Sequence, residues 1–203
     1  MERSKQAKTT EVGIVKLKIK FVEIKIEGLS PLLVHAFSSK TRIQMEDKQA
    51  GKSKNSKHDI RVPKEDYENA KHKSPLGWEG FPAAGFKASI IRGAKNVGMV
   101  MKDTQTSFFI QADCNKTQLV RIYSDPVEMN TQMVRVGMGS ADVRYRPIYH
   151  NWSATLKVEF NEGMISINQL FQAINAGGYG CGIGEMRPEK GKFDYGRYKI
   201  KGT

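Results

Sequence analysis

The C-terminal part of the chain, residues 152–200, constrains the fold most because it carries two periodicities in a fixed order. Every second residue from 152 to 160 is apolar, which indicates a strand with one buried face. Ser166 and Gln169 then match a capping box, which predicts a helix. The glycine segment, residues 174–200 (INAGGYGCGIGEMRPEKGKFDYGRYKI), follows and ends in a further short strand.

Strand, helix, glycine-rich loop and strand in this order form half of a split βαβ, or ferredoxin-like, unit. An alternating strand at residues 14–27 and a helix at residues 81–94, with Pro82 near its first turn, supply the other half. We therefore predict an α+β fold with a ferredoxin-like, RRM-like antiparallel sheet, helices on one face and a mobile basic insertion. Residues 12–203 are predicted to form one RRM-like domain, with a polar, partly disordered insertion at residues 38–75.

The predicted N-terminal strand changes phase in its middle. Its apolar positions are odd-numbered up to Phe21 and even-numbered from Val22 onward. Because successive strand residues point to opposite faces, this shift predicts a β-bulge or a bend between two environments. Three lysines of the first half share one face, either as a row that tracks phosphates or as the solvated side of the strand: Lys16, Lys18 and Lys20.

Two short β-prone runs lie in the middle of the chain, at residues 107–110 and 119–123. Polar residues separate them, and Asp125-Pro126 ends the second. This pattern predicts a hairpin.

Residues 38–75 differ in composition from the rest of the chain. They are rich in Lys, Ser, Asn and Asp and nearly lack large aliphatic side chains. Such a segment buries too little apolar area to offset the entropy of ordering, so we predict a mobile insertion or a projecting hairpin.

The net charge of +12 makes a polyanion the expected partner, with nucleic acid ahead of an anionic membrane. The alternative is a basic surface that only interacts with solvent. No apolar run is long enough for a membrane helix and no signal peptide is visible, which predicts a soluble, cytoplasmic protein. The two cysteines, Cys114 and Cys181, lack metal-ligand spacing, so neither a metal site, a disulfide nor a cofactor is predicted.

The glycine segment is the first candidate site. Glycine adopts positive φ readily, and successive N–H groups in such a loop can converge on a phosphate. Gly177 is predicted to cap a helix that ends at Ala176. A dinucleotide or Walker loop is excluded because those loops follow a strand and open a helix. The candidate phosphate contacts are the glycines Gly178, Gly180, Gly182 and Gly184 and the cations Arg187, Lys190, Lys192 and Arg197.

Residues 131–152 form the second candidate site because cations and aromatic residues alternate there. Guanidinium groups neutralise phosphates and ring faces stack on bases in proteins that bind single strands. The candidate contacts are Arg135, Arg144, Tyr145 and Arg146. The alternative is a β-hairpin whose aromatic residues face the core. Trp152 fits the core, whereas Tyr145 and Tyr149 fit either interpretation.

Three stretches resemble the RAMP superfamily, the repeat-associated mysterious proteins of CRISPR systems. GIGEMRPEKGKFDYGRYKI is similar to the C-terminal signature of that superfamily, and FVEIKIEGLSPLLVH is similar to the first strand and turn of its backbone subunits. The helix FPAAGFKASIIRGA fits the same layout. The resemblance implies an RRM-like sheet that binds single-stranded RNA at the glycine-rich loop, as a subunit that polymerises along a guide RNA. A phage or mobile-element relative that works alone or as a homo-oligomer is the alternative to a true CRISPR component.

These observations give three hypotheses. The first is a non-enzymatic protein that binds single-stranded RNA or DNA, with RNA ahead of DNA, as a homo-oligomer or a subunit of a ribonucleoprotein complex. The second, an activity of some RAMP relatives, is a metal-independent endoribonuclease, with His35 or His150 as base or acid and Tyr149 or a lysine as partner. The third is a protein that blocks a CRISPR complex without binding nucleic acid, against which the positive charge argues.

Overall fold

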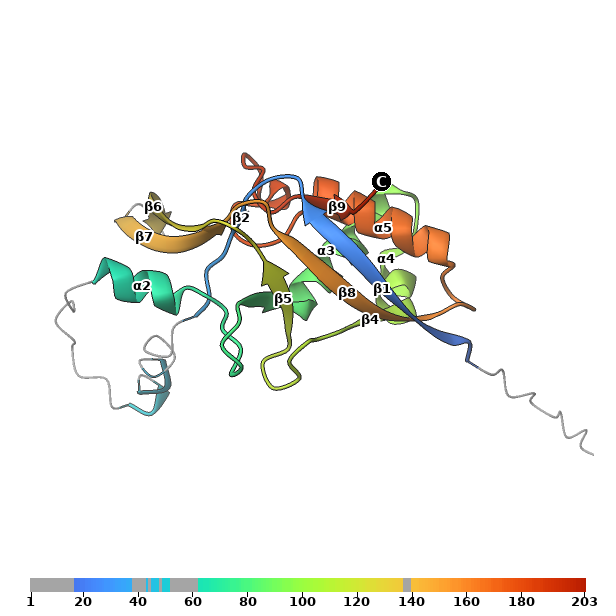
Figure 1. The fold of residues 1–203 in the computed structure, drawn as a ribbon, viewed down its shortest axis with the longest axis horizontal. Coiled ribbons are helices and arrows are strands. Elements are labelled where there is room, and N and C mark those ends of the chain that lie inside the picture. Colours follow the sequence, from blue (N-terminus) through green and yellow to red (C-terminus); the bar gives the residue numbers. More distant parts are fainter. Residues whose placement is uncertain (1–16, 38–42, 44, 48, 52–61, 137–139) are drawn as a thin grey trace, which may run out of the picture.

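The computed structural model of the chain describes residues 17–37, 43, 45–47, 49–51, 62–136 and 140–203. The described residues form an α+β fold around one larger antiparallel sheet, with α3 and α5 behind it (Figure 1). The strands of this sheet are β1 (Ile19–Gly28), β3 (Gly80–Pro82), β4 (Phe108–Gln111), β5 (Leu119–Tyr123), β8 (Ser153–Asn161) and β9 (Tyr198–Ile200). The helices are α2 (Pro63–Asn69), α3 (Ala83–Asn96), α4 (Met101–Ser107), α5 (Ile167–Gly180) and the 3₁₀ turn η1 (Pro188–Lys190).

The strand order of the larger sheet confirms the predicted ferredoxin-like topology. Along the chain, β1 is followed by α3, then by β4 and β5, then by β8, α5 and β9. In space, β8 and β1 lie at the centre, β9 flanks β1, and β4 and β5 flank β8. This is two interleaved split βαβ units, in which β4 and β5 together take the place of a single strand.

Of the two alternatives predicted for the first strand, a β-bulge or a bend between two environments, the β-bulge is wrong. The pairing of β1 with β8 is continuous from Ile19, opposite Asn161, to Glu27, opposite Ser153. The change of phase instead divides the apolar residues between the two faces. Ile24 is buried beneath the helices, whereas the Phe21 side chain is 66% exposed on the outer face.

The predicted hairpin of residues 107–123 is also wrong, although both strands exist. Phe108–Gln111 pairs with the second half of β8, and the end of β5 pairs with its beginning. The long central strand β8 therefore pairs with both short strands, β4 and β5. The local sequence pattern cannot predict this arrangement, because it depends on a strand far away in the chain.

Helices α3 and α5 cross in backbone contact, which explains two glycines. A Cβ on Gly93 would meet the backbone of Gly177, and a Cβ on Gly177 would lie 2.5 Å from the carbonyl oxygen of Ser89. The Ser89 hydroxyl donates to the Gly177 carbonyl at 2.9 Å. The predicted capping role of Gly177 is therefore wrong, because α5 continues to Gly180. The predicted capping box of Ser166 and Gln169 at the start of α5 is confirmed.

A second, smaller sheet projects from the larger one (Figure 1). It contains β2 (Leu32–Leu33), β6 (Val127–Val136) and β7 (Ser140–Tyr149), so the second candidate site lies on a β-hairpin. Helix α2 packs against β7. The end of the predicted insertion is thus a folded helix, while residues 38–42, 44, 48 and 52–61 lie outside the described residues.

Candidate nucleic-acid interface

The glycine loop, defined here as residues 181–197, is held by backbone hydrogen bonds. Gly182 and Gly184 have φ values of +66° and +79°, which favour glycine. The amide of Ile183 donates to Gly196 at 2.9 Å, and that of Glu185 donates to Leu33 at 2.8 Å. These two amides are therefore engaged within the protein and are not free to donate to a phosphate.

Two of the predicted phosphate-binding glycines lie in α5 rather than in the loop. Gly178 is buried, and a Cβ there would meet the carbonyl oxygen and ring of Tyr198. Gly180, the last residue of α5, is exposed beside the Asn96 side chain. Gly178 is therefore a packing residue, needed because β9 passes directly over the helix.

A cavity of about 210 Å³ opens where the glycine loop meets α3. Its polar lining comes from segments far apart in the sequence: His35 after β2, His72 before β3, Ser89 and Arg92 on α3, and Glu185 and Arg187 in the glycine loop. Phe81, the Gly182–Gly184 backbone and small α3 residues complete the wall. Arg187 is predicted from the sequence, whereas Arg92 and His72 are not.

The two histidines of this cavity are electrostatically coupled. Burial lowers the pKa of His35 below its usual value of 6.5, and the Arg144 charge lowers it further while Glu185 opposes this. Burial also lowers the pKa of His72, and the neighbouring His35 adds to this shift. Both imidazoles are therefore mainly neutral at pH 7. No spacing in the sequence connects this pair, because the fold alone brings the two histidines together.

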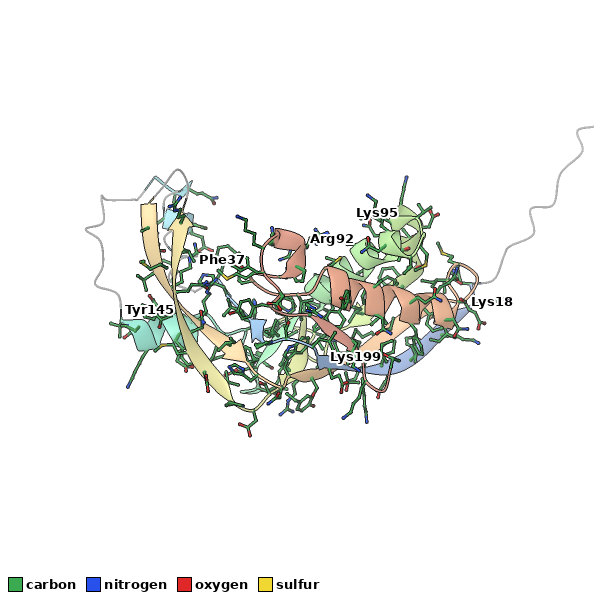
Figure 2. The ribbon with its side chains drawn as sticks, turned by 90° about the horizontal axis from the view of Figure 1, so that it is seen from above. Lys18, Phe37, Arg92, Lys95, Tyr145 and Lys199 are labelled. Atoms are coloured by element: carbon green, nitrogen blue, oxygen red, sulfur yellow. The ribbon has the colours of Figure 1, made fainter. Side chains whose placement is uncertain are left out.

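One carboxylate holds two guanidinium groups at the mouth of the cavity. Glu189 on η1 accepts from Arg92 at 2.7 and 3.0 Å and from Nε of Arg187 at 2.9 Å. Arg187 also donates to the Gly184 carbonyl at 3.0 Å. Figure 2 shows Arg92 beside this turn. Two positive charges against one negative charge leave the group with a net charge of +1.

The predicted hairpin residues divide into surface and interior groups. Arg135 is exposed, Tyr145 is half-buried, and Arg144 lies 3.8 Å from Asp142. Arg146 is not a surface cation: its side chain is 1% exposed, donates to Gln132 at 2.8 Å and lies 3.7 Å from Glu185. Burial lowers the pKa of Arg146. Arg146 therefore links β7 to the glycine loop.

Burial assigns Tyr149 and Trp152 to the protein core. The Tyr149 side chain is 2% exposed, and its hydroxyl donates to Glu79 at 2.7 Å. Burial, followed by this hydrogen bond, raises the pKa of Tyr149. Trp152 is 1% exposed, as predicted. His150, the neighbour of Tyr149 in sequence, lies 3.6 Å from Glu128 and does not line the cavity.

The remaining predicted cations lie around the glycine loop. Lys190 and Lys192 are exposed, and neither has an ion-pair partner among the described residues. Arg197 covers the Tyr179 ring at 4.8 Å and lies 3.9 Å from Asp194. Figure 2 shows a further aromatic residue, Phe37, between the hairpin and the glycine loop, and its side chain is 81% exposed.

Metal ligands and membrane-spanning helices leave recognisable patterns in a structure. Within the described ranges, no three His, Cys, Asp or Glu side chains are grouped as a metal ion would require. No helix in the part of the chain that the structure describes has the length and apolarity to cross a membrane.

No protein-family model matches the chain, and no curated protein sequence matches it. Among solved structures, the chain is similar to Cmr6 from Pyrococcus furiosus, with a TM-score of 0.42 and 10% sequence identity. The alignment covers 91% of this chain and 100% of that chain. The α+β assignment rests on the strand order and helix positions of the chain itself.

Proposed function

We propose that this protein binds single-stranded nucleic acid, RNA ahead of DNA, at the mouth of the cavity between α3 and the glycine loop. The observation that carries the proposal is the convergence of Arg92 and Arg187 beside two histidines in one concave site. Guanidinium groups suit phosphate because their N–H donors match its oxygens in a fixed geometry. Lys190 and Lys192 extend the positive surface along the loop.

Aromatic residues on and beside the hairpin favour a single strand over a duplex. Phe37 exposes its ring, and Tyr145 lies next to Arg144 on β7. Unpaired bases stack on such rings, whereas the bases of a duplex are already stacked. Assembly as a homo-oligomer, or within a ribonucleoprotein complex, belongs to the same proposal. A light-scattering mass measured with and without a single-stranded oligonucleotide tests binding and assembly together.

Glu189→Gln is expected to strengthen binding. The substitution removes the carboxylate that neutralises Arg92 and Arg187 and leaves both guanidiniums available to phosphate. Affinity should rise about 3- to 10-fold near 0.1 M salt, and the slope of log affinity against log salt should steepen by about 0.7 for each cation released. Fluorescence anisotropy with a labelled oligonucleotide at several salt concentrations measures both quantities.

Glu162→Gln is the matched control for this gain. It removes the same charge from another ion pair, at 2.6 Å from Lys20, at the end of β1 away from the cavity. Equal gains from both variants would mean that only the net charge of the protein matters and would remove the cavity from the proposal.

The two-histidine cavity favours a second candidate function, metal-independent RNA cleavage. In this reaction the 2′-oxygen attacks the adjacent phosphorus, one imidazole accepts the 2′ proton, and the other donates a proton to the departing 5′-oxygen. The products are a 2′,3′-cyclic phosphate and a 5′-hydroxyl end. Arg92 and Arg187 would stabilise the charge that develops on the phosphoryl oxygens. His150 has no place in this arrangement because it does not line the cavity.

Cleavage should become faster as the pH falls from 7.5 toward 6. Both histidine pKa values lie below 6.5, so the state with one protonated and one neutral imidazole becomes more populated in that direction. Labelled RNA incubated with the protein and a metal chelator measures the rate. His35→Gln and His72→Gln should each abolish cleavage and retain binding. Equal cleavage by His72→Gln would exclude this mechanism, and intact RNA with the unaltered protein would exclude the activity.

A further inference from the structure

A second cluster of aromatic and cationic side chains lies on the outer face of the larger sheet, away from the cavity. The Arg121 guanidinium on β5 lies 4.9 Å from the centre of the Tyr123 ring and 6.0 Å from that of Trp78. We call these three residues the β5 platform. The Arg121 and Tyr123 side chains point away from the helices, because Val120 and Ile122, which alternate with them on β5, are buried in the core.

The platform is both exposed and fixed in position. The Tyr123 side chain is 51% exposed, and Arg121 has no ion-pair partner among the described residues. β5 pairs with β3 on one side and with β8 on the other, so its backbone does not depend on a loop. An exposed ring on a rigid strand is the arrangement on which unpaired bases stack.

Groups that can recognise a base edge lie next to the ring. An open groove of about 500 Å³ is lined by Arg121, Ile122, Tyr123, Ser124, Asp125, Asn151 and Ser153. Asp125 and Asn151 are exposed, and neither side chain has a hydrogen-bond partner among the described residues. A carboxylate accepts from the amino groups of bases, and an amide can both donate and accept.

The sheet connects this platform to the glycine loop. Ser153 on β8 lies between Tyr123 on β5 and Glu27 on β1 in the strand registers. Glu27 in turn lies opposite Lys199 on β9. Lys199 belongs to β9, which directly follows the glycine loop. Three steps between strands separate Tyr123 from Lys199, about 14 Å in total. Glu27 in this row is paired with Lys199 at 3.5 Å.

We propose that the β5 platform is a base-stacking subsite that binds an unpaired nucleobase of the strand held at the glycine loop. The base stacks on the part of the Tyr123 ring that Arg121 leaves open, and Arg121 contacts the adjacent phosphate. Asp125 and Asn151 border the base edge. This inference rests on the proposed function and deepens it, because it adds a second contact and a direction across the sheet.

Tyr123→Ala tests the subsite through affinity and cross-linking. Loss of one stacked base corresponds to about 1–3 kcal/mol, so affinity for a single-stranded oligonucleotide long enough to reach both sites should fall about 5- to 150-fold. Tyr123→Phe keeps the ring and should bind like the unaltered protein. Phe109→Ala is the control, because it removes another exposed ring of the same sheet that lies 4.1 Å from the Lys87 ammonium. An oligonucleotide carrying 5-iodouridine should cross-link to Tyr123 or Trp78.

The outcomes separate the subsite from the proposed function. No binding by the unaltered protein would refute the proposed function itself. Binding that Tyr123→Ala leaves unchanged, with cross-links only around the cavity, would refute the subsite alone. Equal losses in Tyr123→Ala and Phe109→Ala would also overturn it, because the whole outer face would then bind without a defined position. A thermal unfolding curve of each variant shows that it is folded.

Discussion

Replacing Gly177 by alanine is expected to lower the free energy of unfolding by about 3 kcal/mol, because the crossing of α3 and α5 has no room for a methyl group. The Cβ would lie 2.5 Å from the Ser89 carbonyl oxygen and 2.9 Å from the Ile90 Cα. Both neighbours are backbone atoms of a buried helix, so neither can rotate away as a side chain would. The helices must separate, which also weakens the hydrogen bond from Ser89 to the Gly177 carbonyl.

Thermal and urea unfolding measure this effect, with an expected fall in Tm of about 6–12 °C. Gly180→Ala is the matched control, because it makes the same substitution in the same helix. Its Cβ meets only the end of the exposed Asn96 side chain, at 3.3 Å. We expect a change within about 0.5 kcal/mol, since alanine favours a helix and Asn96 can move. Similar losses for both variants would show that the crossing does not determine the requirement for glycine at 177.

Gly177 also illustrates which features of the fold local sequence signals predict and which they do not. Alternation from 152 to 160 and the capping box at Ser166 are local signals, and the structure confirms both. The end of α5 is predicted too early because a glycine that caps a helix and a glycine that meets another helix look alike in sequence. Only the position of Gly93, far away in the chain, distinguishes the two.

The phase change in the first strand misleads for a related reason. Apolar residues on both faces suggest a bulge, since a half-buried sheet has one apolar face. The strand keeps its register and exposes Phe21 instead. The sequence shows which residues of this strand are apolar. Which of them are buried depends on the face of the sheet that the helices cover.

The candidate site is predictable in its charge and only partly in its geometry. The glycine loop carries Arg187 at the cavity, as the cations of this segment suggest. His35, His72 and Arg92 reach the same cavity from three separate segments, so no spacing in the sequence connects them. The amides of Ile183 and Glu185 donate to Gly196 and Leu33, so these two cannot belong to the predicted amide cradle.

Neutralising both guanidiniums in the double variant Arg92→Gln and Arg187→Gln is expected to weaken binding of a single strand about 10- to 100-fold near 0.1 M salt. In the native protein these two cations and Glu189 carry a net charge of +1. In the variant the Glu189 carboxylate is left without its two cations, so the mouth of the cavity repels phosphate. The salt slope should become shallower by about 1.4, the value for two cations on a single strand.

A second double variant, Lys18→Gln and Lys20→Gln, separates local from general electrostatics. It removes the same total charge from the start of the first strand, and Figure 2 shows Lys18 far from Arg92. If the cavity binds the strand, this control loses only the weak long-range attraction, which salt screens over about 10 Å at 0.1 M. Equal losses in the two double variants would mean that the strand follows overall charge and that the cavity has another ligand. A loss confined to the arginine pair, with both proteins equally stable, would place a phosphate between α3 and the glycine loop.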